Sequence, residues 1–281
     1  KRVVKDHFVE KGFLNTQIDI TQKEDTNRIN MVKVIADINK NDKVRIKDII
    51  FHGNKVFSDR RLRRVMKNTK KRNLNIFKAS KLIREDFKED KESLITFYNE
   101  NGYRDARILK DSINILSEDR IKLHIFLEEG SQYYFGDIDW IGNTIYPSEF
   151  LDQVMGIEKG AIFDQTVLEE RLLYDEDAVN STYLDNGYLF FDVIPVETRI
   201  YNDTIDFEMR IHEGKQATIN QIIIEGNTKT NEHVIRREIR TDPGDLFSKR
   251  DIIRSVRELA NLGHFDPEQI APEPIPDQAN G

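Results

Sequence analysis

Apolar and polar residues alternate along three short segments of the chain, and each segment ends in Gly-Asn. Such alternation predicts a strand with one apolar face, and a glycine after it supports a turn with positive φ. The three turn glycines stand 89 and 84 residues apart: Gly53, Gly142 and Gly226. The period predicts tandem copies of one small unit, an organisation that usually presents surfaces rather than one catalytic centre.

The residues between 45 and 131 define the unit. After the first strand, apolar residues at helical spacing predict a helix over about 59–68 and a longer one over about 80–101, which ends at Asn101-Gly102. Two strands follow, over about 103–116 and 121–127, because apolar and polar residues alternate again. The predicted order is therefore β-α-α-β-β.

The order returns elsewhere in the chain. In residues 132–215 the second helix carries apolar residues as far as Tyr183 and ends at Asn186-Gly187-Tyr188. The last segment starts again with a strand around Ile222 and Ile224, but its second helix is shorter and a Pro-rich stretch replaces the final strand. We therefore expect two full repeats and two partial ones, and expect both termini to be fragment boundaries. The four segments are an N-terminal partial repeat (1–44), a first full repeat (45–131), a second full repeat (132–215) and a last repeat (216–281).

The two full repeats carry net charges of opposite sign, which the average composition of the chain does not show. The first full repeat holds 21 Lys and Arg against 14 Asp and Glu, and the second holds 5 against 18. Neighbouring units of opposite sign attract at short range, and the asymmetry argues against a uniform anionic partner such as DNA. The chain contains no cysteine, which excludes disulfides and thiolate metal sites, and no apolar run of membrane-spanning length.

Candidate catalytic and metal-binding residues give weak signals. No two of the six histidines stand at metal-ligand spacing on a shared predicted face, so we predict neither a metal nor a catalytic role for them. A glycosidase would need two carboxylates in a cleft, whereas the acidic residues at 169–170 and 175–177 fit a solvated helix better. We expect no enzyme and no cofactor.

The basic run over residues 60–72 is interleaved with Leu62, Val65 and Met66. This spacing favours an amphipathic helix with a solvated or partner-facing basic side. A contact with anionic lipid head groups or an acidic protein, and binding of nucleic acid, remain as alternatives.

Several motifs in a fixed order carry a resemblance to a known family. The strand-Gly-Asn turns are followed by Gly160-Ala161-Ile162-Phe163 or Gly244-Asp245-Leu246-Phe247 in mid-unit, and by helices that end in Asn-Gly-Tyr. In this respect the chain resembles tandem POTRA (polypeptide-transport-associated) domains. The first full repeat departs from the pattern, because Leu74-Asn75-Ile76-Phe77 lacks the glycine.

The last repeat sharpens the resemblance. Its segments 234–240, 243–245 and 259–265 are similar to the barrel-proximal POTRA domain of BamA-like outer-membrane assembly factors. The string then resembles the second half of POTRA domain two and domains three, four and five of a five-unit array. This implies an α+β fold in which each full repeat is a three-stranded mixed sheet covered on one face by two helices.

The resemblance also implies a function. The chain would be the periplasmic part of an outer-membrane assembly factor, and a transmembrane β-barrel would follow residue 281. Its partners would be unfolded outer-membrane proteins, accessory assembly lipoproteins and periplasmic chaperones. The resemblance leaves open another outer-membrane transporter of the TamA-like or two-partner-secretion kind, a purely structural spacer, or a soluble α+β enzyme.

Two surfaces are the predicted binding sites. An unpaired edge strand offers its N–H and C=O groups to an extended peptide whatever its side chains. By the resemblance, the edge is the second strand of each unit, at about 14–21, 104–115 and 190–198. Because Pro195 interrupts the third of these, we predict that the second is the better edge. Its candidate residues are Arg104, Ala106, Ile108, Lys110 and Ser112.

In the last repeat, the resemblance implies that the first helix contacts an accessory lipoprotein. Glu238 is the leading candidate, with Arg236, Arg237 and Arg240, although a surface helix with internal salt bridges explains these residues equally well. The remaining singled-out residues are turn glycines, for which we predict a structural role: Gly53, Gly142, Gly226, Gly102 and Gly187.

Overall fold

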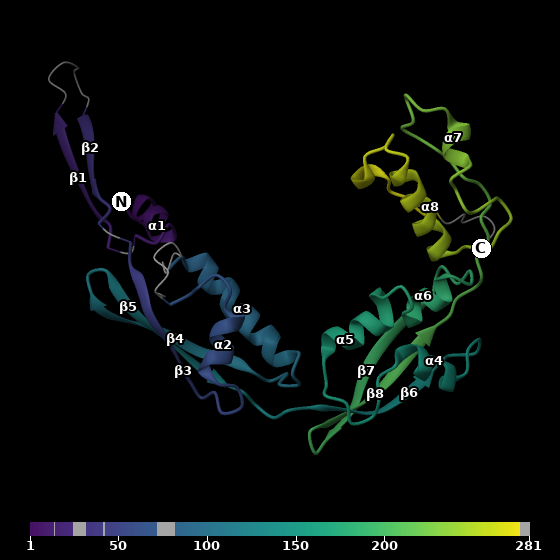
Figure 1. Ribbon diagram of the computed structural model, residues 1–281, viewed down its shortest axis with the longest axis horizontal. Helices are drawn as coiled ribbons and strands as arrows, with labels where there is room; N and C mark the ends of the chain where they lie inside the picture. Colours follow the sequence, from purple (N-terminus) through teal and green to yellow (C-terminus); the bar gives the residue numbers. More distant parts are fainter. Residues whose placement is uncertain (14, 25–31, 42, 72–81, 276–281) are drawn as a thin grey trace. The chain divides into compact units, whose positions relative to one another are not determined.

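The computed structural model describes residues 1–13, 15–24, 32–41, 43–71 and 82–275. The chain forms two compact units, Lys1–Tyr133 and Tyr134–Gly281, whose helices and strands are labelled in Figure 1. Each unit contains one complete three-stranded mixed sheet with helices, so the predicted α+β class is confirmed.

The first unit begins with a helix, a turn and a hairpin, the elements expected in residues 1–44. They are α1 (Arg2–Glu10), β1 (Gln17–Glu24) and β2 (Val32–Asn39). The two strands pair antiparallel from Gln17 opposite Asn39 to Glu24 opposite Val32. Leu14, where we expected an edge strand to start, lies outside the described residues.

The sheet of the first full repeat has the strand order β3-β5-β4, in which β3 runs parallel and β4 antiparallel to β5. Its elements are β3 (Arg45–His52), α2 (Asp59–Val65), α3 (Arg84–Asn99), β4 (Arg107–Ser117) and β5 (Arg120–Glu128). Alternate residues of β5 are buried, and α2 and α3 cover that face (Figure 1). The core therefore lies between one sheet face and the two helices, and it includes Ile121, Leu123, Ile125, Leu62, Leu94 and Tyr98.

Helix α3 ends close to the predicted position. Gly102 has φ +87°, and the N–H of Tyr103 donates to the carbonyl of Tyr98 at 2.9 Å, which closes the helix. The predicted helix start at Ser80 and the Leu74–Phe77 motif lie outside the described residues.

The second full repeat has the same topology, with the strand order β6-β8-β7. Its elements are β6 (Tyr134–Ile141), α4 (Ser148–Met155), α5 (Gln165–Glu169), the π-helix η1 (Glu170–Tyr174), α6 (Val179–Leu184), β7 (Asp192–Tyr201) and β8 (Thr204–His212).

The single long helix predicted in this repeat is wrong, because the segment is interrupted between η1 and α6. Arg171 donates to the carbonyl of Met155 at 3.0 Å, and it also binds the carboxylates of Asp175 and Asp177 at 3.1 and 2.8 Å. Asp175 and Asp177 thus bind Arg171 where the helix is interrupted, and do not form the solvated face of a continuous helix.

The last repeat contains α7 (Glu232–Arg236), α8 (Lys249–Asn261) and the 3-10 helix η2 (Pro267–Gln269). The strand predicted around Ile222 and Ile224 is not formed; only an isolated bridge joins Thr218 to Leu246. In both full repeats the first strand pairs with the third. No third strand is present in the described part of the last repeat, so its first strand lacks a hydrogen-bonding partner.

Candidate functional site

Two of the Gly-Asn turns bring their glycines close to the backbone of a neighbouring strand. Gly53 and Gly142 both have φ +92°, and an added Cβ would lie 2.1 Å from the carbonyl oxygen of Leu127 or 2.3 Å from that of Ile211. Gly226 has φ +81° but no atom within 4 Å of such a Cβ, because no third strand is described beside it. Only the full repeats therefore combine the positive φ with a close backbone approach.

The asparagine of each turn makes the same contact in all three copies. The side-chain Nδ2 donates to the carbonyl three residues later, which is that of Phe57, Tyr146 or Thr230, at 2.9, 3.0 and 3.2 Å. The loop that leads into the first helix is thereby fixed in the same way in each repeat.

A buried carboxylate that sequence reasoning did not single out connects this loop to the second helix. In the first full repeat, Glu129 accepts from the N–H groups of Lys55 and Val56 at 2.7 and 3.2 Å, and from the hydroxyl of Tyr98 at 2.8 Å. The Glu-Gly motif that closes each full repeat was visible in the sequence. Its partners, however, lie 31 and more than 70 residues away, so no local pattern indicated them.

The second full repeat builds the same carboxylate network. Glu213 accepts from the N–H groups of Thr144 and Ile145, both at 2.9 Å, from the Thr144 hydroxyl, and from the hydroxyl of Tyr183 at 2.9 Å. Burial and the hydrogen bond to the carboxylate raise the pKa of Tyr183 far above its ordinary value, and the same causes act on the pKa of Tyr98. Burial tends to raise the pKa of Glu213, but the hydrogen bonds from Thr144, Ile145 and Tyr183 outweigh it and hold that pKa below its usual value.

The glycines of the Asn-Gly-Tyr turns receive a backbone hydrogen bond from about 30 residues further along the chain. The N–H of Tyr133 donates to the carbonyl of Gly102 at 2.8 Å, and that of Ala217 donates to the carbonyl of Gly187 at 2.7 Å. Both glycines have φ near +90°. Each glycine carbonyl thus binds the start of the segment that follows its repeat.

The predicted peptide-binding edge is strand β4, which lies at one side of its sheet and pairs only with β5 among the described strands. Ile108, Lys110 and Ser112 lie on this strand. Arg104 and Ala106 do not, because β4 begins at Arg107; Ala106 is 7% exposed, and the Arg104 guanidinium lies over the Tyr133 ring at 5.5 Å. The edge therefore starts three residues later than predicted.

The two faces of β4 differ in polarity. On the helix-covered side, Ile113 and Ile115 pair with the buried residues Leu123 and Ile121, yet they remain 46% and 71% exposed. On the opposite side the register places Lys110 and Ser112 beside Phe126 and His124. Asp111, opposite the buried Ile125, shares the side of the two isoleucines and binds Lys91 at 2.7 Å. A strand added to β4 would find Ile113 and Ile115 on one face, and Lys110 and Ser112 on the other.

Strand β7 holds the same place in the second full repeat but offers a poorer edge. Pro195 lies within β7 opposite Met209, and a proline on an edge strand removes an N–H donor. Opposite buried Phe207, where β4 has an isoleucine opposite Leu123, β7 has Glu197. Ile200, opposite buried Ile205, is the counterpart of Ile115 and is 51% exposed.

The outer edge of the first strand is partly covered in the second full repeat. The N–H of Phe135 donates to the carbonyl of Ala161 at 2.8 Å, and the N–H of Gly160 donates back to the carbonyl of Phe135 at 2.7 Å. The mid-unit Gly-Ala-Ile-Phe motif thus pairs with the start of β6. Residues 219, 244 and 245 exchange the same bonds in the last repeat.

The predicted partner-binding residues of the last repeat lie on and just after α7, and the structure separates them. Arg236 binds Glu232 at 2.6 Å and the carbonyl of Ile222 at 3.3 Å, much as Arg63 binds Asp59 and the carbonyl of Ile49 in the first full repeat. Arg236 therefore holds the helix against the preceding segment.

The other three residues take part in two separate ion pairs. Arg240 makes two hydrogen bonds to Glu258 of α8, at 2.6 and 2.7 Å, which raise the pKa of the arginine and lower that of the glutamate. Glu238 accepts from its neighbour Arg237 at 2.8 Å, and its side chain is 21% exposed. Arg237, whose side chain is 63% exposed, and Glu238 thus form an ion pair between neighbouring residues, whereas Arg236 and Arg240 bind residues further away along the chain.

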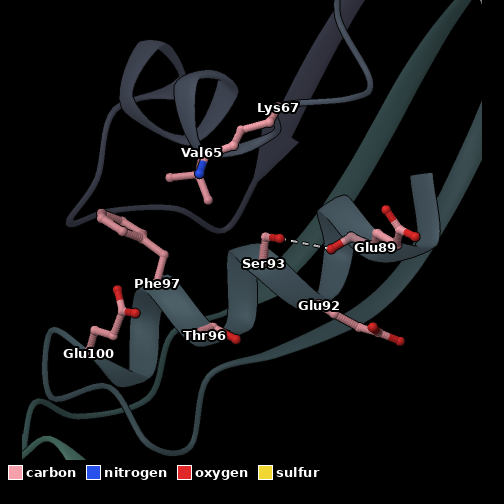
Figure 2. Close-up of a pocket in the computed structure, with 8 residues that line it drawn as sticks. All are labelled: Val65, Lys67, Glu89, Glu92, Ser93, Thr96, Phe97 and Glu100. Atoms are coloured by element: carbon pink, nitrogen blue, oxygen red, sulfur yellow. Dashed lines mark hydrogen bonds between the residues drawn. The ribbon is translucent and has the colours of Figure 1, made fainter. Parts of the chain in front are cut away.

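A groove of about 520 Å³ lies between α2 and α3 (Figure 2). Its lining residues are Val65, Lys67, Glu89, Glu92, Ser93, Thr96, Phe97 and Glu100. Figure 2 shows the carboxylates of Glu92 and Glu100 pointing in different directions, and the Ser93 hydroxyl donating to the carbonyl of Glu89. This groove does not provide the converging carboxylate pair that a glycosidase needs.

Two histidines that are far apart in the sequence lie next to each other in the sheet. His52 and His124, on β3 and β5, contact each other with Nε2 and Nδ1 2.9 Å apart. Their separation of 72 residues hid the pair from sequence reasoning. Within the described residues, no group of three or more His, Cys, Asp or Glu side chains is placed to hold a metal ion. Nor is any helix there long and apolar enough to cross a membrane.

Comparison with known proteins identifies similar sequences along nearly the whole chain. The model of the POTRA family, described as a surface antigen variable number repeat, matches residues 44–130, 133–214 and 217–281. Outer membrane protein assembly factor BamA of Neisseria meningitidis is 28% identical over 277 residues, which are 97% of this chain and 34% of that protein. Its counterpart from Neorickettsia risticii is 32% identical over 238 residues, 83% of this chain and 31% of that protein. The chain spans about a third of the length of these relatives.

A solved structure has a similar fold. The crystal structure of Haemophilus influenzae BamA POTRA3-5 superposes with a TM-score of 0.58 at 21% identity, over 79% of this chain and 87% of that one.

Proposed function

Because this chain belongs to the POTRA family, we propose that it is the peptide-binding region of an outer-membrane protein assembly factor, on the periplasmic side of the outer membrane. Its relatives from Neisseria and Neorickettsia carry that function in their names. The proposal divides the chain into repeats at 1–44, 45–131, 132–215 and 216–281, with the first and last being parts of two further copies.

The proposed activity is capture of unfolded outer-membrane proteins by strand addition to β4. The observation that carries it is the outer side of β4, which pairs with no other strand of the described residues, together with the exposure of Ile113 and Ile115. An edge strand binds through main-chain hydrogen bonds, so many sequences fit. Strands of outer-membrane barrels alternate apolar and polar residues, and the C-terminal half of β4 likewise alternates Ser112 and Asn114 with Ile113 and Ile115.

A pair of matched lysine variants tests this proposal. A charge on an edge strand opposes strand addition, so Ile115→Lys should weaken binding of a barrel-strand peptide by about tenfold, the cost of one apolar contact. Ile200→Lys makes the same change at the corresponding site of β7 and should leave the affinity nearly unchanged. Fluorescence anisotropy with a labelled peptide measures both. Equal losses in the two variants, or none in Ile115→Lys, would refute the assignment to β4.

A second proposed role is binding of an accessory assembly lipoprotein by the last repeat. Arg237 and Glu238 support it, since they contact mainly each other and leave part of their charge to solvent. Glu238→Lys should abolish binding of the isolated accessory proteins, and Arg237→Glu should weaken it. Arg236 serves as the structural control, because Arg236→Ala should lower the stability of the last repeat as well as binding. Binding of every accessory protein by Glu238→Lys at wild-type affinity would rule the role out.

A further inference from the structure

The open face of the β3-β5-β4 sheet, opposite α2 and α3, carries two imidazoles in direct contact. His52 lies at the end of β3 and His124 in the middle of β5, with Nε2 of the first 2.9 Å from Nδ1 of the second. Their rings are nearly parallel, at 14°, with centroids 5.2 Å apart. The Phe126 ring stacks on His52 at 4.4 Å. Stacking and hydrogen bonding thus hold both rings in position before any ligand arrives.

We propose that this histidine pair binds a divalent transition-metal ion of the Zn²⁺ class, which takes the place of the proton shared by the two nitrogens. A neutral imidazole nitrogen is a common ligand of such ions. Tetrahedral Zn²⁺ with Zn–N distances of about 2.05 Å places two ligand nitrogens about 3.3 Å apart. The observed 2.9 Å separation therefore has to open by only about 0.4 Å, which a small rotation of either side chain supplies.

The surroundings define what kind of site this is. In the described residues no third histidine or carboxylate joins the pair into a larger metal-binding group. Solvent would complete the coordination shell, as at sites that leave positions open. Lys110 lies over the Phe126 ring at 4.6 Å, and Lys122 precedes His124 by two residues on β5. The positive charges of Lys110 and Lys122 repel the metal cation, so the site binds its metal weakly and exchanges it readily.

A bound ion would join β3, at one side of this sheet, to the central strand β5, with which it pairs in parallel. Because the ion binds the folded arrangement and not an unfolded one, it should raise the stability of the first unit by RT ln(1 + c/Kd), where c is the free zinc concentration, and this gain grows with the logarithm of c above Kd. The effect should be reversed by a chelator.

The test uses the whole 281-residue chain titrated with ZnCl₂. We expect saturable binding of one ion, seen by isothermal calorimetry, with chemical-shift changes of the His52 and His124 imidazole signals in NMR spectra. His52→Gln and His124→Gln should each weaken binding by more than the roughly tenfold that loss of an outer-shell partner costs. His212→Gln is the matched control, because His212 also lies on the third strand of a full repeat but is not part of the pair.

Two results would overturn the proposal. One is unchanged imidazole signals of His52 and His124 in the wild-type chain at millimolar ZnCl₂, a measurement that needs no variant to fold. The other is Zn²⁺ affinity that survives in both His52→Gln and His124→Gln, with amide spectra showing that their β3 and β5 remain formed. Loss of binding in His212→Gln instead would place the ion elsewhere.

Discussion

Replacing Glu213 by alanine should destabilise the second full repeat by about 2–4 kcal/mol. The change removes the carboxylate that accepts four hydrogen bonds. Thr144 and Ile145 are exposed, so water can take over their N–H groups. The hydroxyl of Tyr183 is fully buried and would be left without its acceptor, at a cost of about 1–3 kcal/mol. Loosening of the turn into α4 adds about 1 kcal/mol.

The single tryptophan of the chain makes the measurement specific to this repeat. Trp140 lies on β6, is buried, and donates from its indole nitrogen to Asp152 at 2.7 Å. Its fluorescence during urea unfolding therefore reports on the sheet that Glu213 closes. Tyr183→Phe, which leaves the carboxylate its other donors, should cost only about 1 kcal/mol. Glu158→Ala, at an exposed loop position, should change the stability by less than about 0.5 kcal/mol.

The same carboxylate gives a pH dependence with a definite sign. The pKa of Glu213 is lower in the folded protein than its ordinary value, so its contribution is complete above the unfolded pKa, near 4.3. It is lost as the pH falls below that value and through the folded pKa. Glu213→Gln should therefore show a smaller drop in the Trp140 unfolding midpoint between neutral and acid pH than the wild type. Equal pH profiles, or a Glu213→Ala chain as stable as Glu158→Ala, would refute the reasoning.

Two further changes test the turns and the first strand. Gly53→Ala should destabilise the first unit by about 3 kcal/mol or more, since the added Cβ meets the Leu127 carbonyl. Gly226→Ala should cost only about 1 kcal/mol, the penalty for a non-glycine residue at positive φ. Urea unfolding followed by circular dichroism compares the two variants, and equal losses of stability would count against the close approach at Gly53. Trp140→Phe should cost about 1 kcal/mol, because it removes the indole donor of Asp152 but water can reach this exposed carboxylate. An unchanged midpoint by the same method would contradict this.

Most of the fold followed from patterns that are local in sequence. Alternation along residues 121–127 indicated a strand with one buried face, and Asn101-Gly102 marked the end of α3. The predictions failed where contacts between residues distant in the sequence determine the structure. Arg171 binds carbonyls of α4 and two downstream carboxylates, and so interrupts a helix that spacing alone would continue. A strand at Ile222 would form only beside a partner strand, and the alternation of the residues around Ile222 does not show whether such a partner is present.

The candidate sites followed the same division. The resemblance implied an edge strand at residues 104–115, and β4 lies at one side of its sheet. The pairing register was needed to show that Ile113 and Ile115 share the helix-covered side. Glu129 and Glu213 stood in a visible repeat motif, yet their role depends on tyrosines about 30 residues upstream. The His52–His124 contact joins parallel strands separated by two helices and a strand, so only the sheet order reveals it.

Backbone amide NMR during titration with an unfolded barrel-strand peptide tests the central claim most directly. If the chain captures its clients by strand addition, the amides of Arg107–Ser117 should shift or broaden together, and their hydrogen exchange should slow once the peptide pairs with them. The amides of Asp192–Tyr201 should change less, because Pro195 and Glu197 weaken that edge. Peptide binding that leaves β4 undisturbed and moves amides elsewhere would contradict the proposal.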